Sequence, residues 1–142
     1  MGLITDTGVF IRAEREGHRD PVALIPLDEE LGISSITLSE LLEGIYYAKT
    51  QLRAERRRDF VERAKAVVPV IAFDETIAEV HAGLRAKQRS RGKMIGAHDL
   101  IIAATAMSLG WDVLTTNAAE FQQVEGLRVR DIASLSESGL EP

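Results

Sequence analysis

The chain has 142 residues, a formal net charge of −5 and no cysteine. Its length predicts a single domain with a core of its own, and the lack of cysteine excludes a disulfide framework and thiolate chemistry. No apolar run approaches the roughly 18 residues that a membrane span needs, and the N-terminus lacks the pattern of a signal peptide. We therefore expect a cytoplasmic protein without a membrane partner.

The basic residues are concentrated in two segments of an otherwise acidic chain. Residues 49–65 carry seven Lys/Arg and three Asp/Glu, and residues 85–93 carry five Lys/Arg and no acid. Such segments could hold a phosphate backbone beside a cation-binding site. They could equally be solvated helix faces, and composition alone does not separate the two interpretations.

The first half of the chain alternates between short apolar runs and amphipathic stretches. Thr7 is placed to cap a first helix, and Thr37 with Glu40 fits a capping box for a second. Residues 22–31 are ambiguous and could include a short helix interrupted at Pro26. The remaining pattern predicts strands over 3–5 and 32–36, and helices over 7–16, 37–49 and 52–67.

The second half repeats this alternation. Residues 99–109 are apolar on almost every side, as in a buried helix, and Gly110 ends that helix. The pattern predicts strands over 70–73, 113–116 and 127–129, a helix over 74–90, a loop over 92–97 and a turn or short helix over 117–121. We expect one domain over 1–133 and a frayed tail over 134–142. This order predicts an α/β fold with a mainly parallel sheet of four to five strands, flanked by helices on both faces.

Asp6-Thr7-Gly8 matches the signature of the aspartic proteases, in which two such aspartates share a proton. It also suits a metal-binding carboxylate at the end of a parallel strand. The protease fold is almost all β, and a second Asp-Thr-Gly is missing from this chain. The α/β order therefore favours the metal-binding interpretation.

Polar side chains recur where a predicted strand gives way to a helix. Because open α/β sheets place their sites at the carboxyl ends of the strands, these groups could meet at one edge. Each could also be a helix cap, a partner of a helix dipole or a turn residue. The set comprises Asp6, Glu40, Asp99, Asn117 and Glu120.

Convergence of three of these carboxylates would need a compensating charge. Two unit charges about 4 Å apart repel by roughly 4 kcal/mol at an effective dielectric near 20, which is a large part of the stability of a domain. A divalent cation, a shared proton or a basic side chain would relieve that repulsion. Oxygen ligands suit Mg²⁺ or Mn²⁺, whereas the three histidines lack zinc-site spacing.

Three stretches, LITDTGVF, ITLSELLEGI and IGAHDLIIAATAMSLGWDVLTTNAAEF, resemble in order and spacing the PIN-domain ribonucleases, most closely the VapC toxins of type II toxin–antitoxin systems. The resemblance runs from Leu3 to about Val129. It implies a PIN-like nuclease domain over 1–133. The catalytic residues that it implies are Asp6, Glu40, Asp99 and, at a position where the family has Asp or Asn, Asn117.

The resemblance also implies a function and its partners. Asp6, Glu40 and Asp99 would hold one or two Mg²⁺ or Mn²⁺ ions for hydrolysis of RNA phosphodiester bonds, which would inhibit translation or growth. Thr115 or Thr116 could supply a supporting hydroxyl, and Glu120 could replace the carboxylate that Asn117 lacks. Toxins of this kind form homodimers and are held inactive by a VapB-like antitoxin.

The candidates for RNA contact are Arg89, Arg91 and Lys93, which precede Asp99. His98 is expected to support the local structure rather than to bind phosphate. Tyr46 and Tyr47 are expected in a core or a subunit interface.

Two other classes of function stay open. A PIN-like domain could bind RNA or protein without cutting it, although retention of the three acids argues against this. A metal-dependent phosphoesterase could act on small substrates, but the chain has no phosphate-cradling glycine-rich loop and no Asp-x-Asp pair.

Overall fold

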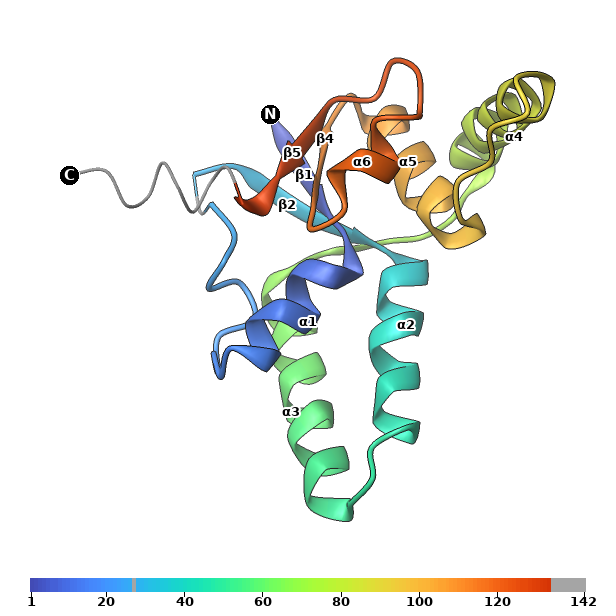
Figure 1. Cartoon of the computed structure of the whole chain (residues 1–142). Coiled ribbons are helices and arrows are strands. Elements are labelled where there is room, and N and C mark those ends of the chain that lie inside the picture. Colours follow the sequence, from blue (N-terminus) through green and yellow to red (C-terminus); the bar gives the residue numbers. More distant parts are fainter. Residues whose placement is uncertain (27, 134–142) are drawn as a thin grey trace.

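The computed structural model describes residues 1–26 and 28–133 and contains a five-stranded sheet, all of whose strand pairs are parallel (Figure 1). The strand order is β3-β2-β1-β4-β5. The strands are β1 (Gly2–Thr5), β2 (Glu30–Ser34), β3 (Val70–Ile71), β4 (Asp112–Thr115) and β5 (Val129–Asp131). The predicted parallel sheet is confirmed, and the aspartic protease interpretation is excluded because that fold is almost all β.

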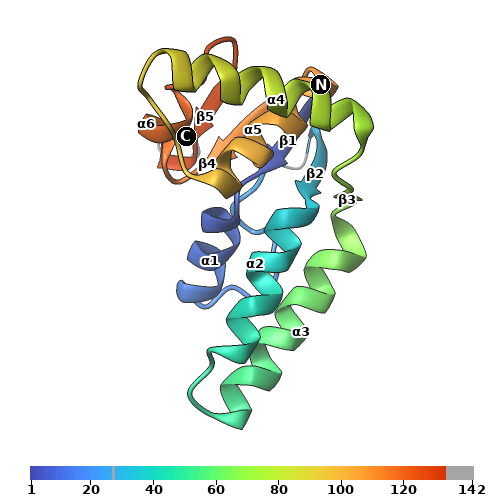
Figure 2. The same cartoon turned by 90° about the vertical axis from the view of Figure 1, so that its right-hand side faces the viewer.

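Helices cover both faces of the sheet, as the sequence predicted. They are α1 (Thr7–Arg15), α2 (Ser35–Tyr46), α3 (Gln51–Val67), α4 (Glu75–Ser90), α5 (Ala97–Leu109) and α6 (Ala118–Phe121). Figures 1 and 2 agree in showing α2 and α3 as a hairpin that extends well beyond the sheet. The tail predicted over 134–142 lies outside the described residues.

Alternation along the strands supplies two separate cores. Leu3 and Leu114 pack with the buried side chains of α1, α2 and α3 on one face. Ile4 and Val113, one residue away in each strand, pack with those of α4, α5 and α6 on the other. Because both faces are covered, the central strands are apolar at consecutive positions rather than at every second one.

The capping box predicted for the second helix is wrong. Helix α2 begins at Ser35, and the hydroxyl of Ser34 accepts a hydrogen bond of 3.2 Å from the backbone N–H of Ile36. Thr37 is fully buried inside the helix. Strand β2 accordingly ends at Ser34 instead of residue 36, so Glu40 is not the reciprocal partner of a cap.

The other differences are shifts of element bounds. Residues 21–25 form turns instead of a helix, with Val22 and Ile25 packed into the core of α1, α2 and α3. Helix α5 begins two residues earlier than predicted and ends where Gly110 adopts the left-handed conformation, at φ 68°. Strand β5 starts at Val129, two residues later than expected.

Candidate active site

The site lies where the two central strands end. β1 and β4 run side by side and in parallel, with Ile4 paired with Val113. In the sheet, β2 lies on one side of β1 and β4 lies on the other. This is a topological switch point, where open α/β sheets leave a crevice beyond the strand ends. Asp6 follows β1 there, and its backbone N–H donates to the carbonyl of Leu114 at 2.9 Å.

Asp6 is almost completely buried at this edge, with 7% of its surface exposed. Its Oδ2 accepts a hydrogen bond of 2.7 Å from the hydroxyl of Thr115. Burial raises the pKa of Asp6, and the bond from Thr115 and the backbone N–H of Thr7 only partly offset this effect. Thr115, rather than Thr116, is therefore the threonine that supports the carboxylate.

Glu40 reaches the same edge from the second turn of α2. Its Oε1 accepts a hydrogen bond of 2.7 Å from the hydroxyl of Thr7, and its Oε2 lies 3.4 Å from Nδ1 of His98. The predicted cap at Thr7 is wrong because Asp6 occupies the N-cap position of α1. The hydroxyl of Thr7 binds Glu40 instead, which ties α1 to α2. His98, expected only to support the loop, lies against a site carboxylate.

Asp99, in the first turn of α5, carries the largest electrostatic perturbation of the site. Burial, a hydrogen bond with the carboxyl group of Glu120, and the negative charges of Asp6, Glu120 and Glu40 raise the pKa of Asp99 to about 7. A hydrogen bond between two carboxyl groups needs a proton on one of them. These four acids thus share one field, and part of their repulsion is relieved by a proton.

Glu120 belongs to this cluster. Its Oε1 accepts from the backbone N–H of Gly96 at 2.9 Å, and its Oε2 accepts from Nδ2 of Asn117 at 2.9 Å. The backbone N–H of Asn117 donates to the hydroxyl of Thr115. The polar groups that follow β4 are thereby linked to Asp6 on one side and to the loop before α5 on the other. The catalytic role predicted for Asn117 stays a prediction.

The donor set has the chemistry that hard divalent cations prefer. The converging groups are carboxylates and one carboxamide, and none is a sulfur ligand. In the described conformation of residues 1–26 and 28–133, no three Asp, Glu or His side chains are arranged so that they could hold one ion. Ligation of one ion by three of them would therefore require side-chain rotation.

Sequence reasoning missed two arginines beside this edge. Arg12 and Arg15 of α1 line a hollow of about 460 Å³ together with Gly8 and Thr116. A Cβ atom at Gly8 would lie too close to the hydroxyl oxygen of Thr116, so a larger residue here would have to displace that hydroxyl. Their spacing could have indicated this position, because residues three apart on a helix, such as Arg12 and Arg15 after Asp6, lie on the same face.

The three basic residues proposed for RNA contact are all exposed, and they lie at the end of α4 and in the loop that follows. Arg91 forms an ion pair with Glu125. The structure does not test contact with RNA, so the roles of Arg89, Arg91 and Lys93 stay predictions.

Comparison with known proteins identifies the family to which this fold belongs. The sequence model of the PIN domain matches residues 3–127. The chain belongs to the PIN domain family. A PIN-domain relative named ribonuclease VapC from Rickettsia bellii is 34% identical over 91% of this chain and 95% of its own length. A tRNA(fMet)-specific endonuclease VapC from Salmonella typhimurium is 40% identical over 70% of this chain and 73% of its own.

A solved structure shares the fold of this PIN domain. It is a member of the VapBC family of toxin–antitoxin systems from Mycobacterium tuberculosis, with a TM-score of 0.72 and 28% identity over 92% of this chain and 96% of that one. The predicted resemblance to VapC-type ribonucleases is confirmed by these relatives. No helix within the described ranges is long and apolar enough to cross a membrane.

Proposed function

We propose that this protein is the toxin of a toxin–antitoxin pair, a Mg²⁺- or Mn²⁺-dependent endoribonuclease that hydrolyses RNA phosphodiester bonds and so inhibits translation or growth in the cytoplasm. The observation that carries the proposal is the meeting of Asp6, Glu40, Asp99 and Glu120 at one sheet edge, where the pKa of Asp99 rises to about 7. Such a perturbation in a crevice is typical of a functional site. The VapC relatives support the ribonuclease class.

The side chains of this chain would divide the chemistry as follows. Asp6, Glu40 and Asp99 would hold the cation, and Thr115 and Thr7 would orient the first two through the hydrogen bonds described above. Asp99 must be ionised to act as a ligand, so the proton that it shares with Glu120 would leave first. A bound divalent cation would lower the pKa of a water nucleophile and neutralise charge on the phosphodiester.

The geometry also supports two protein partners, an antitoxin and a second copy of this chain. A hollow of about 240 Å³ between α1, α2 and α3 reaches Glu40, and an antitoxin segment seated there could direct a basic side chain toward the carboxylates. Tyr46 and Tyr47 are 82% and 71% exposed at the end of α2. The core position considered for them is therefore wrong, and a homodimer interface is the remaining prediction.

The decisive experiment incubates the purified protein with cellular RNA, with Mg²⁺ or Mn²⁺ and then with a chelator. The Asp6→Asn and Asp99→Asn variants should lose cleavage, whereas Asp59→Asn, a surface control paired with Arg63, should keep it. Fragments that persist with the chelator and in both site variants would refute the proposed chemistry. Retained RNA binding without cleavage would favour a non-catalytic module, and cleavage of a small phosphoester alone would favour a phosphoesterase.

A further inference from the structure

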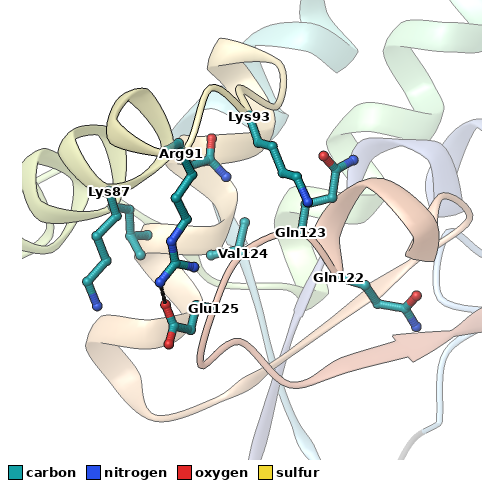
Figure 3. A pocket seen from close by; sticks show the side chains of 9 residues that line it. Lys87, Arg91, Lys93, Gln122, Gln123, Val124 and Glu125 are labelled. Carbon is teal, nitrogen blue, oxygen red and sulfur yellow. Dashed lines mark ion pairs between the residues drawn. The ribbon is translucent and has the colours of Figure 1, made fainter.

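Another cavity is lined by residues that lie close in sequence to the carboxylates, but none of the four site carboxylates lines it. It has a volume of about 680 Å³ and lies between the last turns of α4 and the segment after α6 (Figure 3). Lys93 lines it three residues before Gly96, and Gln122 lines it two residues after Glu120. Gly96 and Glu120 are joined by a hydrogen bond at the edge of the acidic cluster. The same two segments therefore form part of both sites.

The lining of this cavity is net positive, in contrast to the acidic cluster. Figure 3 shows Lys87, Arg91 and Lys93 extending from α4 and the loop after it, with Glu125 on the opposite segment. Arg91 is neutralised by Glu125. Lys87 and Lys93 have no ion-pair partner among the residues described. Two lysines are thus available to an anionic ligand.

The cavity also offers hydrogen-bonding groups and an apolar wall. Gln88 is only 5% exposed, and its Oε1 accepts from the backbone N–H of Ile95 at 3.1 Å. Its Nε2 is buried without a hydrogen-bond partner in the described structure, which is an unfavourable state for an amide donor. Gln122 and Gln123 add two exposed amides, and Leu84 and Val124 are buried apolar neighbours.

We propose that this cavity binds one unpaired nucleotide of the substrate RNA and thereby positions the strand for cleavage at the carboxylates. The inference rests on the proposed ribonuclease function. Lys87 and Lys93 would bind phosphate, and the exposed amides of Gln122 and Gln123 would bind the edge of the base. Leu84 and Val124 would contact its face. The volume lies within the range of small-ligand pockets. Only an unpaired base can present its edge inside a cavity, because duplex RNA keeps its base edges in the grooves.

Binding is measured first, with a chelator present so that RNA is not consumed. A labelled single-stranded oligoribonucleotide is titrated against the protein at several salt concentrations. The Lys87→Gln/Lys93→Gln variant should bind roughly tenfold more weakly at low salt and lower the slope of log affinity against log salt by about 1.4, since each single-strand phosphate contact contributes about 0.7. The Arg19→Gln variant removes an exposed charge outside the cavity and outside both basic segments, and it should leave the slope unchanged.

A second measurement uses the chain without substitutions. Oligoribonucleotides that carry a photoreactive uridine should crosslink to peptides spanning residues 84–93 and 122–125. Equal binding by the Lys87→Gln/Lys93→Gln variant and the Arg19→Gln control, together with crosslinks elsewhere, would overturn the site while leaving the ribonuclease proposal intact if cleavage persists. Crosslinks in the cavity without any cleavage would retain the site and refute the nuclease. Binding of a mononucleotide at affinity equal to that of the oligonucleotide would overturn the assignment to RNA, and so would protection of the cavity by an antitoxin but not by RNA.

Discussion

Carboxylates at the two ends of the sheet have opposite electrostatic environments. At the amino ends of the strands, Asp112 accepts hydrogen bonds from Arg128 at 2.6 Å and from Arg130 at 2.9 Å, and Arg130 also forms two bonds with Glu29. Although burial opposes ionisation, these two arginines hold the pKa of Asp112 below its usual range. At the carboxyl ends, Asp99 forms no ion pair with any residue in the described ranges, and its pKa is raised to about 7.

The contrast separates an acid that stabilises the fold from one that we propose is functional. Compensated carboxylates stabilise the fold they belong to, whereas clustered carboxylates without compensation reduce stability and persist where a ligand or reaction requires them. The chain contains enough arginine to neutralise both ends, yet Arg128 and Arg130 serve only the amino end. The difference between Asp112 and Asp99 is therefore a property that substitutions can test.

The largest expected effect is loss of activity at the carboxyl end. Asp99→Asn should reduce RNA cleavage by roughly 10²–10³-fold, because a lost cation ligand removes several kcal/mol of transition-state stabilisation. Asp112→Asn should leave the rate per folded molecule unchanged. Single-turnover cleavage assays on both variants measure the difference. An Asp99→Asn protein as active as the parent would place the catalytic centre elsewhere.

The next effect concerns stability at the amino end. Arg130→Met removes the arginine that pairs with Glu29 and one of the two that pair with Asp112. The free energy of unfolding should therefore fall by about 2 kcal/mol. This loss is smaller than for a fully buried pair because Arg130 is partly exposed. Urea titration measures this change. Arg63→Met, which breaks the exposed pair with Asp59, is the control and should change stability little. Equal losses in the two variants would remove the special status of the Asp112 network.

A smaller effect is expected from the hydroxyl that orients Asp6. Thr115→Val keeps the shape of the side chain but removes the 2.7 Å bond to Oδ2 of Asp6. Loss of a group that orients a ligand typically reduces metal affinity or activity by about 10–100-fold, and we expect about the lower figure. Mn²⁺ titration followed by a thermal-shift assay measures the affinity directly. Thr116→Val is the neighbouring control, and a similar loss there would show that the bond to Asp6 is not responsible.

Much of the fold follows from local patterns. The apolar runs at β1 and β4 are buried at every position, and α5 is apolar along almost its whole length. Such sequences predict a parallel sheet with both faces covered. Helix starts were harder, because Ser34 and Thr37 are both good capping residues. Which of the two residues caps α2 depends on where β2 stops pairing with β3, at Ile71. Tertiary packing sets that register.

The site was predictable only in part for the same reason. Asp6 and Asp99 could be chosen from their places after a strand and at a helix start. The hydrogen bond from Gly96 to Glu120 and the contact of His98 with Glu40 depend on how α5 docks, which local sequence does not encode. The pairing of Asp112 with Arg130 similarly depends on the β4–β5 register.

The pH dependence of stability is the most direct test of the contrast, because the two acids should respond to pH with opposite signs. In the folded protein Asp99 titrates near 7, whereas an unfolded chain would release that proton near 3.9. Between these values the folded state binds more protons, so the contribution of Asp99 to stability falls as pH rises from about 4 to 7. Asp112 has a lowered pKa, so its contribution is present above about 4 and is lost as pH falls below that value.

Thermal unfolding in the presence of a chelator, followed by circular dichroism from pH 3 to 8, separates the two contributions. The melting temperature of Asp99→Asn should exceed that of the parent by a margin that grows between pH 4 and 7, because the amide cannot acquire the repelling charge. The deficit of Asp112→Asn should instead shrink as the pH drops below 4. Parallel curves for the parent and Asp99→Asn across pH 4 to 7 would mean that the four acids do not share one field, and the carboxyl edge would then be no more strained than the amino edge.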